Sequence, residues 1–295
     1  MAIYSIKDLE KLSGIKAHTI RIWEQRYKIM SPKRTKTNIR YYDDHDLKKL
    51  LNIALLNRHG LKISKISEMS KDQIMEKVSE VAEISLESSS QLDALLLSMM
   101  EMDEGKFDRI INANIQQLGF EDTMIQVIYP FLDKLGMLWL TGSFSPVQEN
   151  FISLLIRQKI VVAIDRIGNR EPSTNQKVFL TYLPKGERQE LSILFIHYLI
   201  KSRGHRVVYI GQDIPNEDLE DACRILSPDY LFTLIMETFS HESVDHYVES
   251  VLSSVPFSTK LILSGYQVVA QQVEPRNRLV MLKNLQDTLV FLENI

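Results

Sequence analysis

The sequence predicts a multidomain protein: a winged helix-turn-helix, then a four-helix bundle, then an α/β domain with a doubly wound parallel sheet. Three observations support this fold class. Near the N-terminus, two short amphipathic helices are joined by a tight turn at Gly14, as in a helix-turn-helix. The middle of the chain has helical periodicity throughout, and the last third alternates short apolar strands with helices. We place the three domains at residues 1–78, 90–167 and 176–295.

The composition is that of a globular protein, with 44% hydrophobic and 25% charged residues in a chain of 295. No apolar run reaches the roughly 18 residues that a membrane-spanning helix needs, and the N-terminus lacks the apolar stretch of a secretory signal. We therefore expect a cytoplasmic protein without a membrane partner. The single cysteine, Cys223, excludes an internal disulfide and a multi-cysteine metal site, so we assign no metal ligands.

The charge is unevenly distributed along the chain. Residues 1–78 contain 17 Lys and Arg against 9 Asp and Glu, although the whole chain has 35 against 38 and a net charge of −3. A basic N-terminal region on an acidic body is typical of a nucleic-acid-binding domain attached to a domain with a different task. A solvated charged face would give the same asymmetry.

The first two predicted elements form the helix-turn-helix. Ser5 can cap a helix over 6–12 that ends at Gly14. A second helix over 17–27 follows almost at once, and its apolar stripe directs Trp23 toward the core rather than toward a base.

A β-hairpin wing and a further helix complete the first domain. Pro32 and the basic run after it predict the hairpin, and of the adjacent Tyr41 and Tyr42 we expect one to lie in the core. The helix over 43–60 begins with acidic residues, which interact favourably with the N-terminal end of the helix dipole.

Polar and basic side chains on the second helix and on the wing are the candidate DNA contacts. A helix that enters a major groove presents such side chains to base edges and phosphates, and cations on a wing reach backbone phosphates. An ordinary surface charge explains any single arginine here, but the combination points to DNA. The candidate DNA-binding residues are Lys16, His18, Thr19, Arg21, Arg26, Lys33, Arg34, Arg40 and Tyr41.

Four short stretches of this domain form one pattern: Ser5–Leu9, Gly14–Ile15, Thr19–Glu24 and Ile39–Tyr42. Through them the sequence resembles the MerR family of winged-helix regulators over nearly all of residues 3–70. The resemblance implies binding to an inverted-repeat operator in double-stranded DNA as a dimer or higher oligomer. Many members dimerise through one long C-terminal helix. No heptad run of that kind follows here, so we expect oligomerisation through another element.

The second domain is predicted to be entirely helical. Apolar residues at helical spacing predict three helices between 92 and 139, and Pro130 is expected to kink the third. A fourth helix over 146–167 begins with Ser145 and Gln148, the arrangement of a capping box. Four helices of this length favour a small bundle.

The third domain alternates strands and helices, the pattern of a parallel sheet covered by helices on both faces. Ligands of such sheets bind beyond the carboxyl ends of the strands. The predicted strands are 177–183, 206–211, 230–235, 260–265 and 278–282.

Several positions in the last two domains form a second pattern. Trp139 and Glu149 match a Trp-x9-Glu-His signature of the bundle. In the α/β domain, Gly211–Pro215 matches a Gly-x-Asp-x-Pro turn, Thr233 stands where a Ser or Thr is expected, and Ser264–Gly265 matches a Gly-Gly position. This part of the chain resembles the flavodoxin-like cobalamin-binding module of corrinoid methyl carriers, methionine synthase and light-sensing repressors of the CarH and LitR type.

The resemblance implies a cofactor site between the bundle and the sheet. In such repressors, adenosylcobalamin bound there promotes assembly in the dark, and light breaks the cobalt–carbon bond. The resemblance assigns Trp139, Glu149, Gln189, Asp213, Thr233 and Gly265 to this site.

The chain departs from the family where cobalt would be held. Gln189 replaces the histidine that ligates cobalt from below, and Ser192 replaces a glycine in the same loop. Asn150 stands where the bundle signature has its histidine. A glutamine amide is a poor ligand beside the neutral imidazole that transition metals favour. We interpret Glu187 and Glu190 in this loop as solvated charges.

The sequence therefore predicts a DNA-binding transcriptional regulator, a repressor and not an enzyme, whose trunk senses a signal or drives assembly into a homo-oligomer. Either the trunk holds cobalamin without a protein ligand from below, or it is a module for self-association, a protein partner or another ligand. A corrinoid-carrier component of a methyltransferase system is the alternative function. The helix-turn-helix and the absent cobalt-ligating histidine argue against it.

Overall fold

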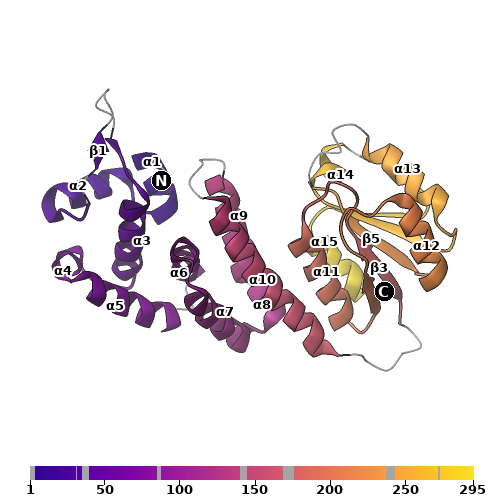
Figure 1. Ribbon diagram of the computed structural model, residues 1–295, viewed down its shortest axis with the longest axis horizontal. Helices are drawn as coiled ribbons and strands as arrows, with labels where there is room; N and C mark the ends of the chain where they lie inside the picture. Colours follow the sequence, from indigo (N-terminus) through magenta and orange to yellow (C-terminus); the bar gives the residue numbers. More distant parts are fainter. Residues whose placement is uncertain are drawn as a thin grey trace. The chain divides into compact units, whose positions relative to one another are not determined.

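The computed structural model describes residues 4–30, 32–34, 40–84, 88–139, 145–168, 176–236, 243–271 and 273–295. Contacts divide the chain into two compact units, Met1–Leu155 and Ile156–Ile295. The first unit holds a winged helix-turn-helix and the helices after it, and the second holds a parallel sheet (Figure 1). Among the described residues, no helix combines the length and the apolar character needed to span a membrane.

Helices α1 (Ile6–Ser13) and α2 (Ala17–Tyr27) form the helix-turn-helix. The Ser5 hydroxyl accepts the Asp8 N–H, and the Asp8 carboxylate accepts the Ser5 N–H at 2.7 Å, so α1 begins with a complete capping box. Gly14 ends the helix with a φ of 69°, in the left-handed region where glycine is favoured. The tight turn follows from this conformation.

The wing is a short antiparallel pair of strands, β1 (Lys33–Arg34) and β2 (Arg40–Tyr41), in which Lys33 faces Tyr41. Helix α3 (Asp44–Arg58) follows directly. Asp43 caps α3 by accepting the backbone N–H groups of the first turn, as the acidic start of this segment predicts.

The core of this head lies between the three helices and the base of the wing. Tyr4 and Tyr42 pair through two backbone hydrogen bonds of 2.9 Å, which attach the wing to the chain before α1. Trp23 is 7% exposed, so it packs in the core as predicted. The other large buried side chains of the head include Leu9, Leu12, Ile20, Leu47, Leu50 and Leu51.

Helices α4 (Ile63–Glu68) and α5 (Lys71–Ile84) lead from the head to α6 (Ser88–Glu101) and α7 (Glu104–Leu118). Helix α6 packs against α3 of the head as well as against α7. The described head and the helices after it therefore belong to one contact unit, and the boundary predicted between residues 78 and 90 stays a prediction.

The long segment around Pro130 is helical but irregular. It contains α8 (Phe120–Thr123), a π-helical turn η1 (Met124–Ile128) and α9 (Tyr129–Trp139). A proline inside a helix has no N–H, and its ring clashes with the carbonyl four residues earlier. The π turn ends two residues before Pro130, and the N–H of the intervening Tyr129 bonds to the carbonyl of Met124, five residues back. The disturbance predicted at this proline thus takes the form of a widened turn.

Helix α10 (Pro146–Ile167) runs through the boundary between the two contact units. Gln148 accepts both the backbone N–H and the hydroxyl of Ser145 at 3.1 Å, so the glutamine half of the predicted capping box is present. Several apolar side chains of α10 remain exposed, among them Val147, Leu154 and Val161, which are seven residues apart.

The second unit contains a five-stranded parallel sheet in the order β4-β3-β5-β6-β7, the flavodoxin-like arrangement. All five predicted strands are present. Their bounds are β3 (Val178–Tyr182), β4 (Arg206–Tyr209), β5 (Tyr230–Leu234), β6 (Lys260–Ser264) and β7 (Leu279–Leu282).

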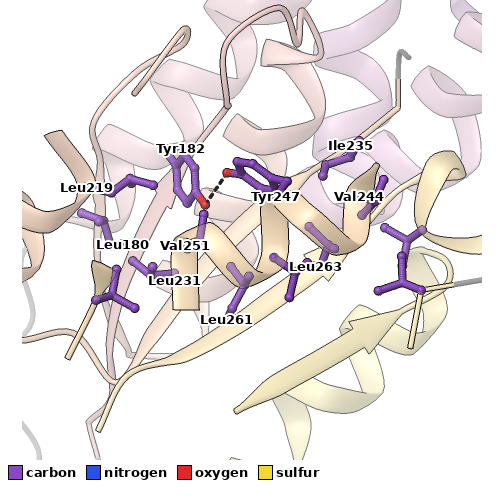
Figure 2. Close-up of a cluster of buried hydrophobic side chains, with 14 of the residues drawn as sticks. Leu180, Tyr182, Leu219, Leu231, Ile235, Val244, Tyr247, Val251, Leu261 and Leu263 are labelled. Atoms are coloured by element: carbon purple, nitrogen blue, oxygen red, sulfur yellow. Dashed lines mark hydrogen bonds between the residues drawn. The ribbon is translucent and has the colours of Figure 1, made fainter. Parts of the chain in front are cut away.

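Helices cover both faces of this sheet. On one face, α11 (Glu190–Ser202) and α15 (Leu285–Glu293) contact each other, and on the other face α12 (Asn216–Leu226) contacts α13 (Val244–Ser254). Figure 2 shows the core under α12 and α13, where alternate residues of β3, β5 and β6 meet helix side chains. The hydroxyl groups of Tyr182 and Tyr247 hydrogen-bond at 2.8 Å inside this core, so neither is left unsatisfied.

Candidate functional site

Glu10 fixes the geometry of the helix-turn-helix. Its carboxylate accepts the backbone N–H of Ala17, the first residue of α2, at 3.1 Å, and it pairs with Lys16 at 3.2 Å. The hydrogen bond from Lys16, followed by that from Ala17, holds the pKa of Glu10 below its usual value. A side chain of α1 therefore satisfies the free N-terminus of α2 and orients the helix that carries the candidate DNA contacts.

The outer face of α2 carries the predicted side chains. Lys16, His18, Arg21 and Arg26 are exposed, whereas Thr19 is half-buried. Ile22, an apolar side chain that is 44% exposed on this helix, was not among the predicted contacts. An exposed apolar group among cations can contact a thymine methyl in a major groove.

A partly buried hydrogen bond connects the base of the wing to α2. The hydroxyl of Tyr42, which is fully buried, donates to Glu24 at 2.6 Å. Burial and then this carboxylate raise the pKa of Tyr42, so the phenol stays protonated. Tyr42 is thus the tyrosine of the core, and Tyr41 is the one left half-exposed beside the wing.

The cations of the wing differ in their surroundings. Lys33 pairs with Asp43 at 2.9 Å, and this hydrogen bond raises its pKa. The Nε of Arg40 is buried and has no hydrogen-bond partner among the described residues. The side chain of Arg34 and the tip of the wing, with Lys36 and Asn38, lie outside the described residues.

The carboxyl edge of the sheet holds the predicted cofactor residues of the α/β unit. Thr233 is fully buried, and its hydroxyl donates to the carbonyl of Tyr182 at 2.9 Å. Asp213 is exposed and accepts the N–H of Gly186 at 2.8 Å. These polar groups therefore have partners within the protein.

Gly265 and Gln189 lie at the same edge. A Cβ at position 265 would lie 2.3 Å from the carbonyl oxygen of Ile235, so the fold of the sheet itself requires this glycine. Gln189 is half-buried and stands directly before α11, as its N-terminal flanking residue.

The two glutamates of this loop are not solvated charges, so that interpretation was wrong. Glu187 is 2% exposed, and its carboxylate accepts the N–H of Met236 at 3.1 Å, just after β5. Glu190 forms a two-pronged pair with Arg157 of α10, at 2.9 and 3.2 Å. The sequence carries no local signal for either contact because the partners lie 49 and 33 residues away.

An apolar patch lies next to these residues. The side chains of Met236 and Tyr266 are both exposed, and the Met236 sulfur lies 3.3 Å from the Tyr266 backbone nitrogen. Val269, one turn further along α14 (Tyr266–Ala270), is also exposed. The carboxyl edge of the sheet thus presents an apolar surface where flavodoxin-like folds bind their ligands.

The predicted bundle residues lie elsewhere in the chain. Glu149 and Asn150 are exposed on the first turns of α10, and the side chain of Trp139 lies outside the described residues. Within the described part of the chain, no three His, Cys, Asp or Glu side chains gather as metal ligands would.

Comparison with known families assigns the head. Residues 4–73 match the MerR HTH family of regulatory proteins, and residues 91–163 match the B12 binding domain. This chain is a DNA-binding transcriptional regulator whose head matches the MerR HTH family. The regulator therefore joins a head that matches the MerR HTH family to helices that match the B12 binding domain, as both resemblances implied.

Two curated relatives align with most of the regulator, and both are named HTH-type transcriptional repressors of Myxococcus xanthus. CarH is 25% identical over 273 residues, which cover 89% of this chain and 88% of CarH. CarA is 24% identical over 255 residues, which cover 85% of this chain and 83% of CarA. These relatives are regulators rather than enzymes, in agreement with the sequence analysis.

One solved structure supports the fold assignment. The monomethylamine corrinoid protein of Methanosarcina barkeri matches with a TM-score of 0.52 and 12% identity, covering 77% of this chain and all of its own. At this identity the likeness concerns the fold alone: a helical domain followed by a parallel α/β domain.

Proposed function

We propose that the regulator is a repressor that binds an inverted-repeat operator as a homo-oligomer. The observation that carries the proposal is the docked helix-turn-helix, in which Ile20 and Trp23 are buried while the cations of α2 face solvent. The names of the aligned relatives CarH and CarA support repression over activation.

In this proposal, side chains of α2 enter a major groove and the wing holds the flanking backbone. The N-terminal part of a recognition helix reaches base edges. At or near this end of α2 lie Lys16, His18, Thr19 and Arg21. Arg26, with the wing residues Lys33, Arg34, Arg40 and Tyr41, would contact phosphates.

The pairing of Lys33 is compatible with such a contact. The Lys33 side chain is 55% exposed in its ion pair with Asp43, and pairs with an exposed cation contribute little to stability. Exchange of the carboxylate for a DNA phosphate therefore costs little.

For oligomerisation, we propose the exposed face of α10 as a contact with a second copy of the chain. The repeat of Val147, Leu154 and Val161 at intervals of seven keeps these side chains on one side of the helix, as in a coiled-coil seam. Leu154, at 64% exposure, is the most exposed of the three. Substitution of Leu154 with lysine should lower the sedimentation coefficient toward that of a monomer.

For the trunk, we propose that the regulator keeps the architecture of the cobalamin module without a cobalt ligand from below. The donors do not fit a histidine-ligated cobalt, because position 189 carries an amide. The neighbouring Glu187, Asp213 and Thr233 are engaged within the protein. The apolar patch at the carboxyl edge instead favours a protein surface or an apolar ligand.

The operator hypothesis is tested by measuring which duplexes the full-length protein selects from a random pool, followed by reporter assays of the selected site. Recovery of an inverted repeat that lowers reporter expression is the expected result. Selection without any repeat would contradict the dimeric mode, and raised expression would contradict repression.

The trunk hypothesis is tested by titrating adenosylcobalamin in the dark, with absorption and gel filtration recorded together and again after illumination. We expect no co-elution of corrin with the wild-type protein. The variant Gln189→His should gain affinity if the remaining site accepts the corrin. Co-elution of corrin with a larger wild-type species that light dissolves would refute the proposal and identify a photoreceptor without the histidine.

A further inference from the structure

A single buried carboxylate joins the head to the helices after it. Asp93 of α6 is fully buried, and each of its oxygens is held by a different cation. Arg58, the last residue of α3 in the head, donates to Oδ2, and Lys134 of α9 donates to Oδ1 at 2.9 Å. The three charges thus come from three helices, one in the head and two beyond it.

Arg58 also reaches the turn of the helix-turn-helix. Its Nη1 faces Asp93, while its Nη2 donates to the carbonyl of Ser13, the last residue of α1. The same guanidinium packs against Gly14, where a Cβ would lie 3.2 Å from Nη2. Because Gly14 starts the turn into α2, Arg58 supports the point from which α2 takes its direction.

The chemistry of this arrangement makes it sensitive to displacement. A buried carboxylate with two cations is compensated, whereas the loss of one cation leaves an uncompensated charge in a medium of low dielectric constant. Movement of α9 relative to α3 must therefore move Asp93 with it or break a contact. Helix α9 ends at Trp139, five residues beyond Lys134, so the same helix also leads to a predicted cofactor residue.

We propose that Asp93, Arg58 and Lys134 form the joint that transmits the position of α9 to the DNA-binding helix. Arg58 and Lys134 are positioning residues: they act on DNA through the orientation of α2 and contact no base or phosphate themselves. The inference rests on operator binding by the head, as proposed above.

The test compares two lysine variants of the full-length protein. Lys134→Met removes one cation of the joint. Lys106→Met is the matched control, because Lys106 is also nearly buried and pairs with Glu101 at 3.4 Å, a contact between α6 and α7 that involves neither Asp93 nor Arg58. Affinities are measured for the selected operator and for a scrambled duplex, at a temperature where circular dichroism shows both variants folded and sedimentation shows equal oligomeric states.

A positioning role predicts a specific loss. Lys134→Met should bind the operator about tenfold more weakly, within the usual range for coupling between sites. Its affinity for the scrambled duplex and the salt slope should not change, because the phosphate contacts are intact. Lys134→Arg should restore the operator affinity, and Lys106→Met should leave every value as in the wild type.

A second variant decides the outcome if Lys134→Met does not fold. Arg58→Lys keeps the charge, but a single ammonium group cannot reproduce the two guanidinium nitrogens that donate to Asp93 and to Ser13. It should therefore weaken binding to the operator and leave binding to the scrambled duplex unchanged. If the folded variants bound the operator as tightly as the wild type, the joint would be refuted, whereas the proposed operator binding would stand. If the wild-type protein itself did not prefer the operator, the proposed function would fail first and the inference with it.

Discussion

Substitution of Gly265 with alanine tests whether this glycine serves the fold of the α/β unit rather than a cofactor. Its φ of 119° is strained for any residue with a Cβ, and the added atom would lie 2.3 Å from the Ile235 carbonyl oxygen. Ile235 cannot easily retreat, since its N–H bonds to the Ser264 carbonyl at 2.8 Å and its carbonyl accepts the Gln267 N–H at 3.1 Å. The clash therefore has to be relieved by breaking the backbone hydrogen bonds that Ile235, directly after β5, makes with Ser264 of β6 and with Gln267 of α14.

The magnitude follows from two contributions. Strain at an unfavourable φ costs about 1–3 kcal/mol, and overpacking costs about 1–3 kcal/mol more. Gly186 is the matched control, because its φ is 92° and a Cβ there would meet nothing within 4 Å. Gly186→Ala should show the strain alone, so Gly265→Ala should be less stable than the control by about 2 kcal/mol. At about 4 °C per kcal/mol, that difference lowers the midpoint of thermal unfolding by about 8 °C.

The assay can separate the two units of the chain. Both tryptophans, Trp23 and Trp139, lie in the first unit, so their fluorescence follows that unit while circular dichroism follows both. Gly265→Ala should move the dichroism transition of the α/β unit and leave the fluorescence transition in place. Equal midpoints for Gly265→Ala and Gly186→Ala, without added cofactor, would refute the steric argument.

Three further outcomes follow from the head and the trunk. Arg21→Ala should weaken operator binding several-fold and lower the salt slope by about one, as measured by fluorescence anisotropy; an unchanged slope would contradict a phosphate contact. Tyr42→Phe should lower the free energy of unfolding by about 1–2 kcal/mol, because Glu24 loses its donor; denaturation followed by the tryptophan fluorescence of the first unit measures this, and an unchanged midpoint would contradict it. Burial, and then Lys201, lower the pKa of His197 from 6.5 to about 4. Because the folded state disfavours the proton, the contribution of His197 to the free energy of unfolding should be fully present above about pH 6.5 and fall by up to about 3 kcal/mol toward pH 4. Urea denaturation at a series of pH values should show a smaller loss of stability in acid for His197→Gln. An equal loss in the variant would show that other groups cause it.

The elements of both units could be predicted because their signals are local. Each strand of the sheet is a short apolar run between polar turns, and the predicted strands differ from the observed ones by one or two residues at their ends. The helix over 216–226 also has local signals, since Pro215 and Ser227 flank an unbroken helical stripe. The exposed face of α2 also follows from helical periodicity, which separates Arg21 from Trp23.

The partners of individual polar groups could not be predicted in this way. Glu187 appeared to be a loop charge, yet it is buried against a backbone N–H 49 residues away. Likewise, nothing near Asp93 in the sequence indicates that Arg58 and Lys134, 35 and 41 residues distant, converge on it. Gly265 matched a family motif, but its steric reason lies in the carbonyl of Ile235, directly after β5.

The sequence by itself thus determined the order of domains, the type of each element and the kind of head, because periodicity, caps and motifs act over a few residues. Only the tertiary structure decided which charges are compensated, which tyrosine of the wing is buried and which glycine the fold requires. These properties depend on distances between segments that are remote along the chain. Burial then gives the distances their energetic weight, since an unpaired charge or a misplaced Cβ costs far more inside the protein than at its surface.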